Sequence, residues 1–160
     1  MWATLDFESS GLSKQSYPIE VGFSLPDGRV ESVLINPNTS ADLWTYWDDV
    51  AENEIHHISR AELIEDGMSV IQVCQTLNQV LAHYDYVLCD SQWDLFWLGR
   101  LYHAAHMRPS FLLLEVKHWL KGEGIGKDVF VKALEAQGPI KHRAGQDAKQ
   151  IRMAIKTLVS

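Results

Sequence analysis

The early part of the chain carries short apolar runs that are separated by turn residues, a pattern typical of strands. Residues 2–7 predict a first strand. The segment YPIEVGFSLPDGRVESVLI predicts two more strands, which are joined at the turn Pro26-Asp27-Gly28. We therefore expect three antiparallel strands to open the chain.

Further along the chain, apolar residues recur at helical spacing. After the segment NPNTS we expect short helical pieces, and then a helix over residues 69–83 with Val70, Val73, Leu77 and Val80/Leu81 on one face. Next, YVLC predicts a strand, WDLFWLGRLYHAAHM a helix and FLLL a second short strand. Two closing helices are expected over residues 126–137 and 144–158.

This order of elements favours an α/β fold. Hairpins followed by alternating strands and helices predict a mixed sheet that is flanked by helices and has parallel strands in its second half. No repeat, low-complexity tract or linker divides the sequence, so residues 1–160 are expected to form a single domain. In such sheets, sites form where strand ends meet helix starts. Asp6, Asp90 and Asp94 all fall near such ends.

Composition is that of an ordinary globular protein. The chain has 160 residues, of which 46% are hydrophobic and 22% charged, enough for a sizeable core. No basic stretch with a following apolar run opens the sequence, and its apolar runs are too short to span a bilayer. Cys74 and Cys89 lack CxxC spacing, which suggests neither a disulfide framework nor a zinc site. A cytoplasmic location is expected.

Charge is unevenly distributed along the chain. The net charge of -7 argues against salt-driven binding to long duplexes, which needs many basic residues against phosphates. Residues 1–114 hold five of the 14 Lys and Arg and 16 of the 21 Asp and Glu. The remaining residues are therefore net basic. They could face a phosphate chain, although solvated helix faces would give the same pattern.

Two carboxylates stand in the first predicted strand, within the segment TLDFESSGL. Asp6 and Glu8 project from the same face of a strand, about 6 to 7 Å apart by the rise per residue. Burial of such a pair costs several kcal/mol for each group unless a cation or a hydrogen-bond network compensates. The pair is therefore either a surface feature or half of a site.

Two further carboxylates occur at helix starts. Asp94 falls in the first turn of the helix after YVLC, where the helix dipole favours it, and Asp90 is the better candidate for the N-cap. Asp147 borders the buried face of the last helix without a basic partner at helical spacing. His142 lies five residues ahead of it on the connecting loop, where a lone histidine is usually a surface residue.

Together these residues match the needs of phosphoryl chemistry with two metal ions. Mg²⁺ prefers carboxylate, phosphate and water oxygens, so two such ions need several carboxylates that share them. Histidine has a pKa near neutrality and can take a proton from an attacking water. Four carboxylates on three elements and one loop histidine supply both requirements.

Three motifs carry a resemblance to a known family. LDFESSGL is similar to D-x-E-T-T-G-L, CDSQWDLFWL to H-N-x-x-F-D-x-x-F-L, and HRAGQDA to H-x-A-x-x-D-A. Weaker similarity covers PIEVGF, INP and IHHIS. Over nearly its whole length, the chain thus resembles the DEDDh subgroup of the DEDD, or DnaQ-like, 3'-5' exonucleases, which have the ribonuclease H-like fold.

The resemblance implies a role for each matched residue. Two divalent cations, Mg²⁺ or Mn²⁺, would be held by four catalytic carboxylates, and His142 would be the general base. The carboxylates are Asp6, Glu8, Asp94 and Asp147. The segment that cradles the terminal nucleotide is matched by Ser9, Ser10 and Leu12, with His56 and Trp93 near it. Trp93 is equally suited to the core.

The sequence also departs from the family pattern. Cys89 and Asp90 replace the usual His-Asn pair, and His57 replaces a glycine. Asp90 adds negative charge near the site, where it would bind a ligand through water or cap the helix. None of the five catalytic positions is lost, which disfavours an inactive relative.

We therefore expect hydrolysis of the last phosphodiester at a 3' end, with release of nucleoside 5'-monophosphates. Single-stranded RNA or short oligoribonucleotides are the favoured substrates and DNA 3' ends the alternative, since no contact to a 2'-hydroxyl can be read from the sequence. A homodimer would bring a second set of basic residues to the substrate. The alternative from another class is a non-catalytic module that binds a nucleotide or a chain end.

Overall fold

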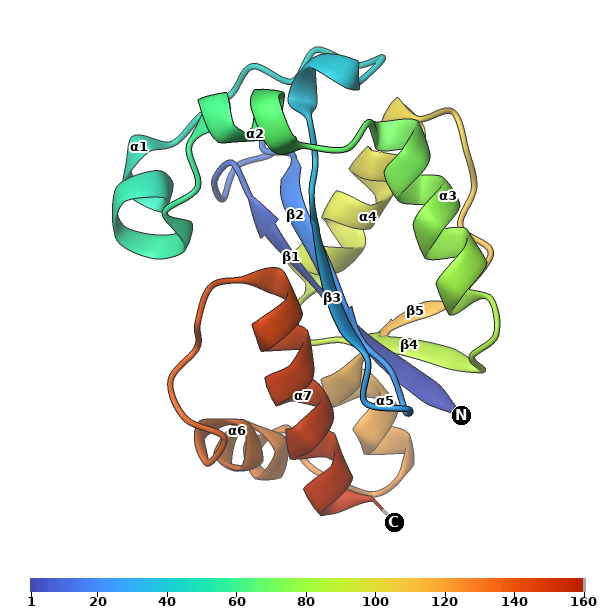
Figure 1. The fold of residues 1–160 in the computed structure, drawn as a ribbon. Coiled ribbons are helices and arrows are strands. Elements are labelled where there is room, and N and C mark those ends of the chain that lie inside the picture. The colour runs from blue at the N-terminus through green and yellow to red at the C-terminus, as the bar shows by residue number, and fades with distance from the viewer. Residues whose placement is uncertain (160) are drawn as a thin grey trace.

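The computed structural model describes residues 1–159, and its strands form one mixed sheet (Figure 1). The five strands are β1 (Trp2–Ser9), β2 (Pro18–Ser24), β3 (Val30–Leu34), β4 (Tyr86–Cys89) and β5 (Leu113–Glu115), in the spatial order β3-β2-β1-β4-β5. The pairs β1/β2 and β2/β3 are antiparallel, whereas β1/β4 and β4/β5 are parallel. The α/β class and the mixed sheet flanked by helices are thus confirmed.

Helices cover both faces of the sheet (Figure 1). One group consists of α3 (Val70–Leu81) and α4 (Gln92–Ala104), and the other of α5 (Val116–Gly122), α6 (Lys127–Glu135) and α7 (Ala144–Leu158). The larger apolar cluster joins α3 and α4 to the sheet, and the smaller one joins α5, α6 and α7 around Leu88. Each face of the sheet therefore has its own core.

Two elements differ from the sequence predictions in this region. Helix α5 was not predicted, because seven residues are too few to show a helical period. The last strand was expected over residues 111–114 but spans Leu113–Glu115, since its residues pair with Val87 to Cys89 of β4. The order of elements after β5 is therefore three helices rather than two.

Short helices fill the connection between β3 and α3. They are η1 (Pro37–Thr39), α1 (Asp49–Ala51), η2 (Glu52–His56) and α2 (Arg60–Asp66). Helix η1 lies within NPNTS itself, and the other three are the short helical pieces expected after it. Helix η2 is a π-helix, a form that occurs mostly as single turns and often at functional sites. In Figure 1 these pieces lie beside the ends of β1 and β2.

Helix α7 packs unusually close to β2. A Cβ atom on Gly22 would lie 2.1 Å from the backbone nitrogen of Gly145, so neither helix nor strand leaves room for a side chain there. The hydroxyl of Thr4 donates to the carbonyl of Ala148 at 2.7 Å. The face of β1 that carries Thr4 therefore meets the start of α7.

Two further features concern membrane-spanning helices and the cysteines. Within residues 1–159, none of the helices has the length and apolar character needed to cross a membrane. Cys74 and Cys89 are both buried and free.

Candidate active site

The predicted carboxylates come together where β1 meets the starts of α4 and α7. Asp6 and Glu8 lie on β1, Asp94 in the first turn of α4 and Asp147 in the first turn of α7. Oδ1 of Asp94 accepts a hydrogen bond from the backbone N–H of Phe7 at 3.1 Å, which ties α4 to the strand residue between Asp6 and Glu8. Three elements thus meet at one place.

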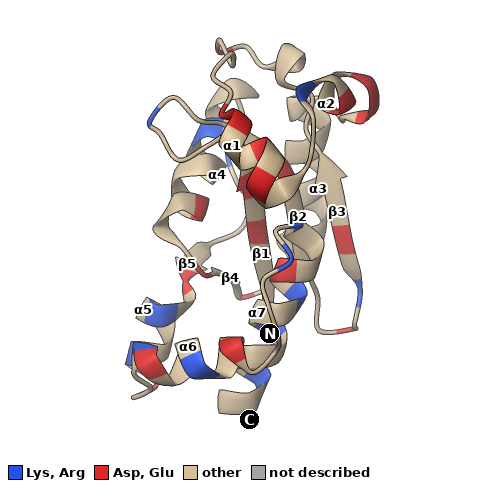
Figure 2. Ribbon diagram, turned by 90° about the vertical axis from the view of Figure 1, so that its left-hand side faces the viewer, with Lys and Arg blue, Asp and Glu red and all other residues tan. Residues whose placement is uncertain are grey.

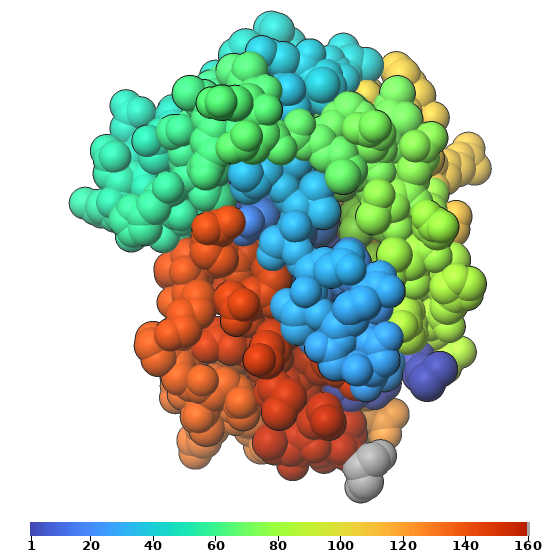
Figure 3. Space-filling model, in the orientation of Figure 1, coloured from blue at the N-terminus to red at the C-terminus, as the bar shows by residue number. Residues whose placement is uncertain are grey.

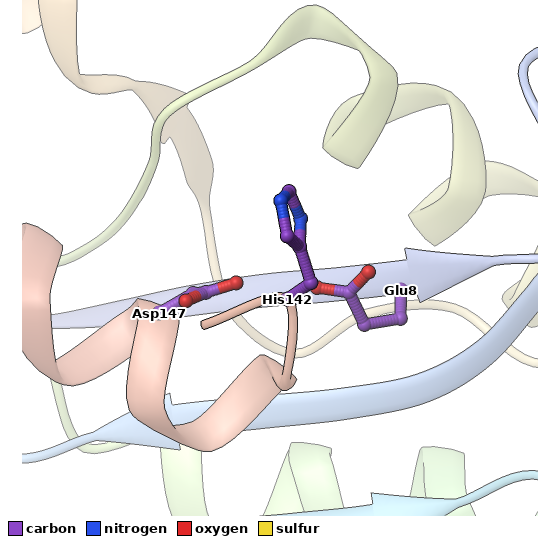
Figure 4. A group of neighbouring side chains, drawn as sticks. All are labelled: Glu8, His142 and Asp147. Atoms are coloured by element: carbon purple, nitrogen blue, oxygen red, sulfur yellow. The ribbon is translucent and has the colours of Figure 1, made fainter. Parts of the chain in front are cut away.

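The closest group joins Glu8, His142 and Asp147 (Figure 4). One ligand atom from each of these side chains lies within 4.8 Å of the other two. Glu8 comes from the strand, Asp147 from the helix and His142 from the loop ahead of the helix. The structure therefore brings the loop histidine next to two of the predicted carboxylates.

Asp94 is fixed by its own helix. Its Oδ2 accepts from the backbone N–H of Ser91 at 3.2 Å, while Ser91 Oγ accepts from the N–H of Trp93 at 3.1 Å. This reciprocal capping box makes Ser91 the N-cap, so the expectation that Asp90 caps α4 is wrong. Asp90 instead pairs with Lys117, whose Nζ lies 3.2 Å from its Oδ1.

The loop before α7 is fixed by Asp147. Its Oδ1 accepts from the backbone N–H of Lys141 at 3.0 Å. His142 follows with φ of 55°, the left-handed conformation that a residue with a side chain rarely adopts. Figure 4 shows His142 between Asp147 and Glu8, with its ring projecting upward in that view.

The protein alone does not balance the charge of these carboxylates. Burial raises the pKa of Asp6 well above its usual range, and repulsion from Asp94 and Glu8 adds to the effect. Burial, followed by repulsion from Asp147, raises the pKa of Glu8 to about 9. Burial also raises the pKa of Asp94 to about 7 and that of Asp147 above its usual range. At neutral pH, burial and mutual repulsion therefore oppose the simultaneous ionisation of all four carboxylates.

This imbalance fits a site for divalent cations. Oδ2 of Asp6 is enclosed by protein and has no hydrogen-bond partner among residues 1–159. The donor set is made of carboxylate oxygens, which Mg²⁺ and Mn²⁺ prefer. Bound cations would remove the repulsion and give Asp6 a partner.

A pocket of about 210 Å³ adjoins the carboxylates. Its walls include Glu8, Ser9, Leu12 and His56 as well as the ring of Trp97. In Figure 3 the surface is indented between the region of α1 and α2, in green, and the start of α7, in orange. The pocket lining itself comes from β1 and the loop after it, from the segment 48–56 and from α4. The pocket is closed by segments that are distant in sequence.

His56 lines this pocket and has a buried ring. Its Nδ1 accepts from the backbone N–H of Ile58 at 3.0 Å, so in the neutral ring Nε2 carries the proton. The side chain is only 4% exposed, and Nε2 has no partner among the described residues. Burial lowers the pKa of His56, which favours this neutral form.

The other predicted substrate residues are placed differently. Ser9 lines the pocket and donates its hydroxyl hydrogen to the carbonyl of Gly11 at 2.8 Å. Ser10 is fully buried outside the pocket lining, and its Oγ accepts from the N–H of Tyr17. Trp93 is partly buried and stacks on Trp97, with 5.4 Å between ring centroids. A role for these residues in substrate binding stays a prediction.

One buried residue beside the site was missed in the sequence. Glu20 on β2 lies directly opposite Glu8 and is 1% exposed. Its carboxylate pairs with Arg143, the residue after His142. The available signal was a single carboxylate in the otherwise apolar segment PIEVGF.

No protein-family model matches this chain, and no curated protein does so either.

Proposed function

We propose that this protein is a metal-dependent 3'-5' exonuclease of the DEDDh type with a ribonuclease H-like fold. It would release nucleoside 5'-monophosphates from the 3' ends of single strands. The observation that supports this most is the meeting of Asp6 and Glu8 with Asp94, Asp147 and His142, each from the motif that predicts it. The sheet order, with three antiparallel strands followed by parallel ones, is compatible with that fold.

The four carboxylates would hold two divalent cations, Mg²⁺ or Mn²⁺. They are Asp6, Glu8, Asp94 and Asp147. When bound, the cations supply positive charge that stabilises the phosphate in the transition state and makes water more acidic. The enclosed, unpartnered Oδ2 of Asp6 and the raised pKa values of these residues support this assignment.

His142 would act as the general base. Its ring takes a proton from the attacking water while the water oxygen forms a bond to phosphorus. The bond between phosphorus and the 3' oxygen of the penultimate nucleotide breaks, and that oxygen leaves with a proton from solvent. The products are a nucleoside 5'-monophosphate and a strand shortened by one nucleotide. Because His142 is only partly buried, it can return its proton to water.

The pocket beside the carboxylates suits one terminal nucleotide. Phe7 and Trp97 give it apolar walls, and the Nε2 hydrogen of His56 would bind an oxygen of the nucleotide. Its volume of about 210 Å³ is below the range of pockets for drug-sized ligands, so it has no room for several nucleotides. This favours action at an end of the strand.

Acidic residues on the far side of the pocket support the same conclusion. Asp48, Ala51 and Ile55 line the pocket, and the segment from 48 to 54 also carries Asp49, Glu52 and Glu54. Figure 2 shows acidic segments on α1 and α2. A further phosphate beyond the terminal nucleotide would meet this negative charge. Internal positions of a strand would therefore bind less well than a free 3' end.

The test uses 5'-labelled single-stranded RNA and DNA of the same sequence, with Mn²⁺, with Mg²⁺ and with chelator. We expect a ladder that shortens from the 3' end, depends on metal and is faster on RNA. Asp6→Ala should abolish it, whereas Asp66→Asn, an exposed acid at the end of α2, should not.

Other outcomes would point elsewhere. A faster ladder on DNA would make the protein an exodeoxyribonuclease. Intact strands under every condition would contradict exonuclease activity. In that case calorimetry with nucleoside 5'-monophosphates would identify a binding module if affinity did not depend on metal.

A further inference from the structure

Glu20 is a buried charge beside the candidate site. It lies on β2, is 1% exposed and stands directly opposite Glu8 on the neighbouring strand. A buried carboxylate is costly unless it is paired and hydrogen-bonded. Glu20 therefore needs hydrogen-bond donors of its own.

Those partners follow His142 in the sequence. Nε of Arg143 lies 3.1 Å from Oε1 and 3.2 Å from Oε2 of Glu20, and Nη2 of Arg143 lies 2.7 Å from Oε2. The backbone N–H of Ala144 donates to Oε1 at 2.8 Å. All donors to this carboxylate thus come from two consecutive residues. Such charge-assisted, bidentate contacts are the strong kind.

The same contacts complete the start of α7. Arg143 is the N-cap residue, but its side chain makes no capping bond. The first free N–H groups of the helix are instead satisfied from the sheet, Ala144 by Glu20 and Gly145 by Ser32 Oγ at 2.8 Å. The sheet therefore fixes where the helix begins.

His142 is consequently restrained on both sides. The N–H of Lys141 is bound by Asp147, and Arg143 and Ala144 are bound by Glu20. Between these contacts, His142 has φ of 55°, which is unfavourable for a residue with a Cβ and persists only where the surroundings enforce it. The contacts of Glu20 provide part of that enforcement.

We propose that Glu20 is a positioning residue for catalysis. Through Arg143 and the N–H of Ala144, it holds the loop so that the imidazole of His142 faces the scissile phosphate. This inference rests on the proposed function, in which His142 is the base. Glu20 itself would not bind the cations, because both its oxygens already accept hydrogen bonds.

The first test is Glu20→Gln, assayed on a 5'-labelled oligoribonucleotide with Mn²⁺. We expect kcat to fall by roughly 10 to 100-fold, since misplacement of a reacting group by about 1 Å has effects of this size. KM and the affinity for Mn²⁺, measured by calorimetry, should stay within about threefold, because the four metal carboxylates remain. The matched control is Glu31→Gln, which breaks the exposed pair of Glu31, on β3, with Arg29 and should change nothing.

A double-mutant cycle then separates positioning from general structural support. In a His142→Ala background, Glu20→Gln should lower kcat by less than about twofold, because its effect acts through the missing ring. An equal loss of kcat in both backgrounds would overturn the proposal. So would an affinity for Mn²⁺ that falls in step with kcat, or a Glu20→Gln enzyme with wild-type kcat.

Hydrogen exchange tests the contact without using activity. Amide protection across residues 140–146 should drop in Glu20→Gln and stay unchanged in Glu31→Gln. If the wild-type protein hydrolyses no substrate, the proposed function fails, while unchanged protection in Glu20→Gln would overturn the restraint itself. Should Glu20→Gln fail to fold, Arg143→Gln removes the same ion pair from its half-exposed side and serves all three measurements.

Discussion

Glu8 and Glu20 face each other across β1 and β2, yet the protein treats them in opposite ways. Glu20 accepts hydrogen bonds from Arg143 and from the start of α7. Glu8 lies beside Asp147 and His142, and burial, followed by repulsion from Asp147, raises its pKa to about 9. Glu20 is thus paired with a basic side chain, whereas Glu8 lies against another acid.

The difference separates a scaffold residue from a site residue. A buried charge with complete partners holds elements together, here β2 to the loop before α7. A buried charge without them lowers stability, and it persists where function needs it. The acidic surroundings of Glu8 on β1 therefore suit a site that is completed by a cation, and its neighbour Glu20 on β2 supports that site.

Replacement of each glutamate by glutamine should show the largest effects. Glu8→Gln is expected to lower kcat by roughly 10³-fold or more, because it removes a proposed metal ligand. Above about pH 9, where Glu8 is ionised, it should also raise the Tm of the metal-free protein, since it removes a buried charge and its repulsion from Asp147. Glu20→Gln should lower Tm by roughly 2 to 10 °C, from a loss of about 1–3 kcal/mol at a chain of this size.

Thermal unfolding in chelator measures the change in Tm of each variant, and an assay with Mn²⁺ measures the change in kcat. If both variants lowered the Tm of the metal-free protein equally, the contrast between the two glutamates would be wrong. Glu31→Gln, on the exposed part of β3, serves as the neutral control.

His142→Ala tests the proposed general base, which lies beside Glu8 and which Glu20 would position. Loss of a general base should slow turnover by roughly 10² to 10⁴-fold. The affinity for Mn²⁺ should change little, because the carboxylates are intact. His118→Ala, at an exposed position on α5, is a control for the loss of a histidine outside the site. Wild-type rates in His142→Ala would remove this residue from the mechanism.

Much of the fold could be predicted from local patterns in the sequence. The turn at Pro26-Asp27-Gly28 and the apolar stripe of α3 both lie where periodicity and turn residues place them. Helix α5 escaped prediction because it is short, and β5 was displaced because strand pairing, a long-range contact, sets its limits.

The site was partly predictable for a related reason. Asp6 and Glu8 stand out because acids in a buried strand conflict with its pattern, and the structure places them beside Asp147. Glu20 stands in an equally buried strand, but its meaning depends on Arg143, 123 residues away. Ser91 was overlooked as a cap because Asp90 competed for that role in the sequence. Partners that are distant in sequence cannot be read from spacing.

The pH dependence of stability should sharpen the contrast further. Folding raises the pKa of Glu8 to about 9 and that of Asp94 to about 7, above the usual values near 4. The folded state therefore binds protons at Glu8 and Asp94 more tightly than the unfolded state does. The stabilisation that this proton binding gives is fully present below about pH 4 and is lost as pH rises through 7 and 9. In chelator, Tm should fall between about pH 5 and 9.

Mg²⁺ binds the deprotonated carboxylates, so its effect on Tm should grow as pH rises over the same range. The double variant Glu8→Gln/Asp94→Asn should show a flatter profile in chelator and little response to Mg²⁺. A metal-free Tm that stays level or rises toward pH 9 would contradict the raised pKa values.

The smallest expected effect concerns His57, which shares the left-handed backbone of His142 but not its place among the carboxylates. His57 ends η2 with φ of 58°, a conformation that glycine adopts without a steric penalty. His57→Gly should therefore raise the free energy of unfolding by up to about 1 kcal/mol, measured by urea titration, and leave kcat unchanged. His142→Gly should relieve the same strain and yet abolish the fast reaction. If His57→Gly also slowed turnover, the strained histidine at η2 would belong to the site rather than to the scaffold.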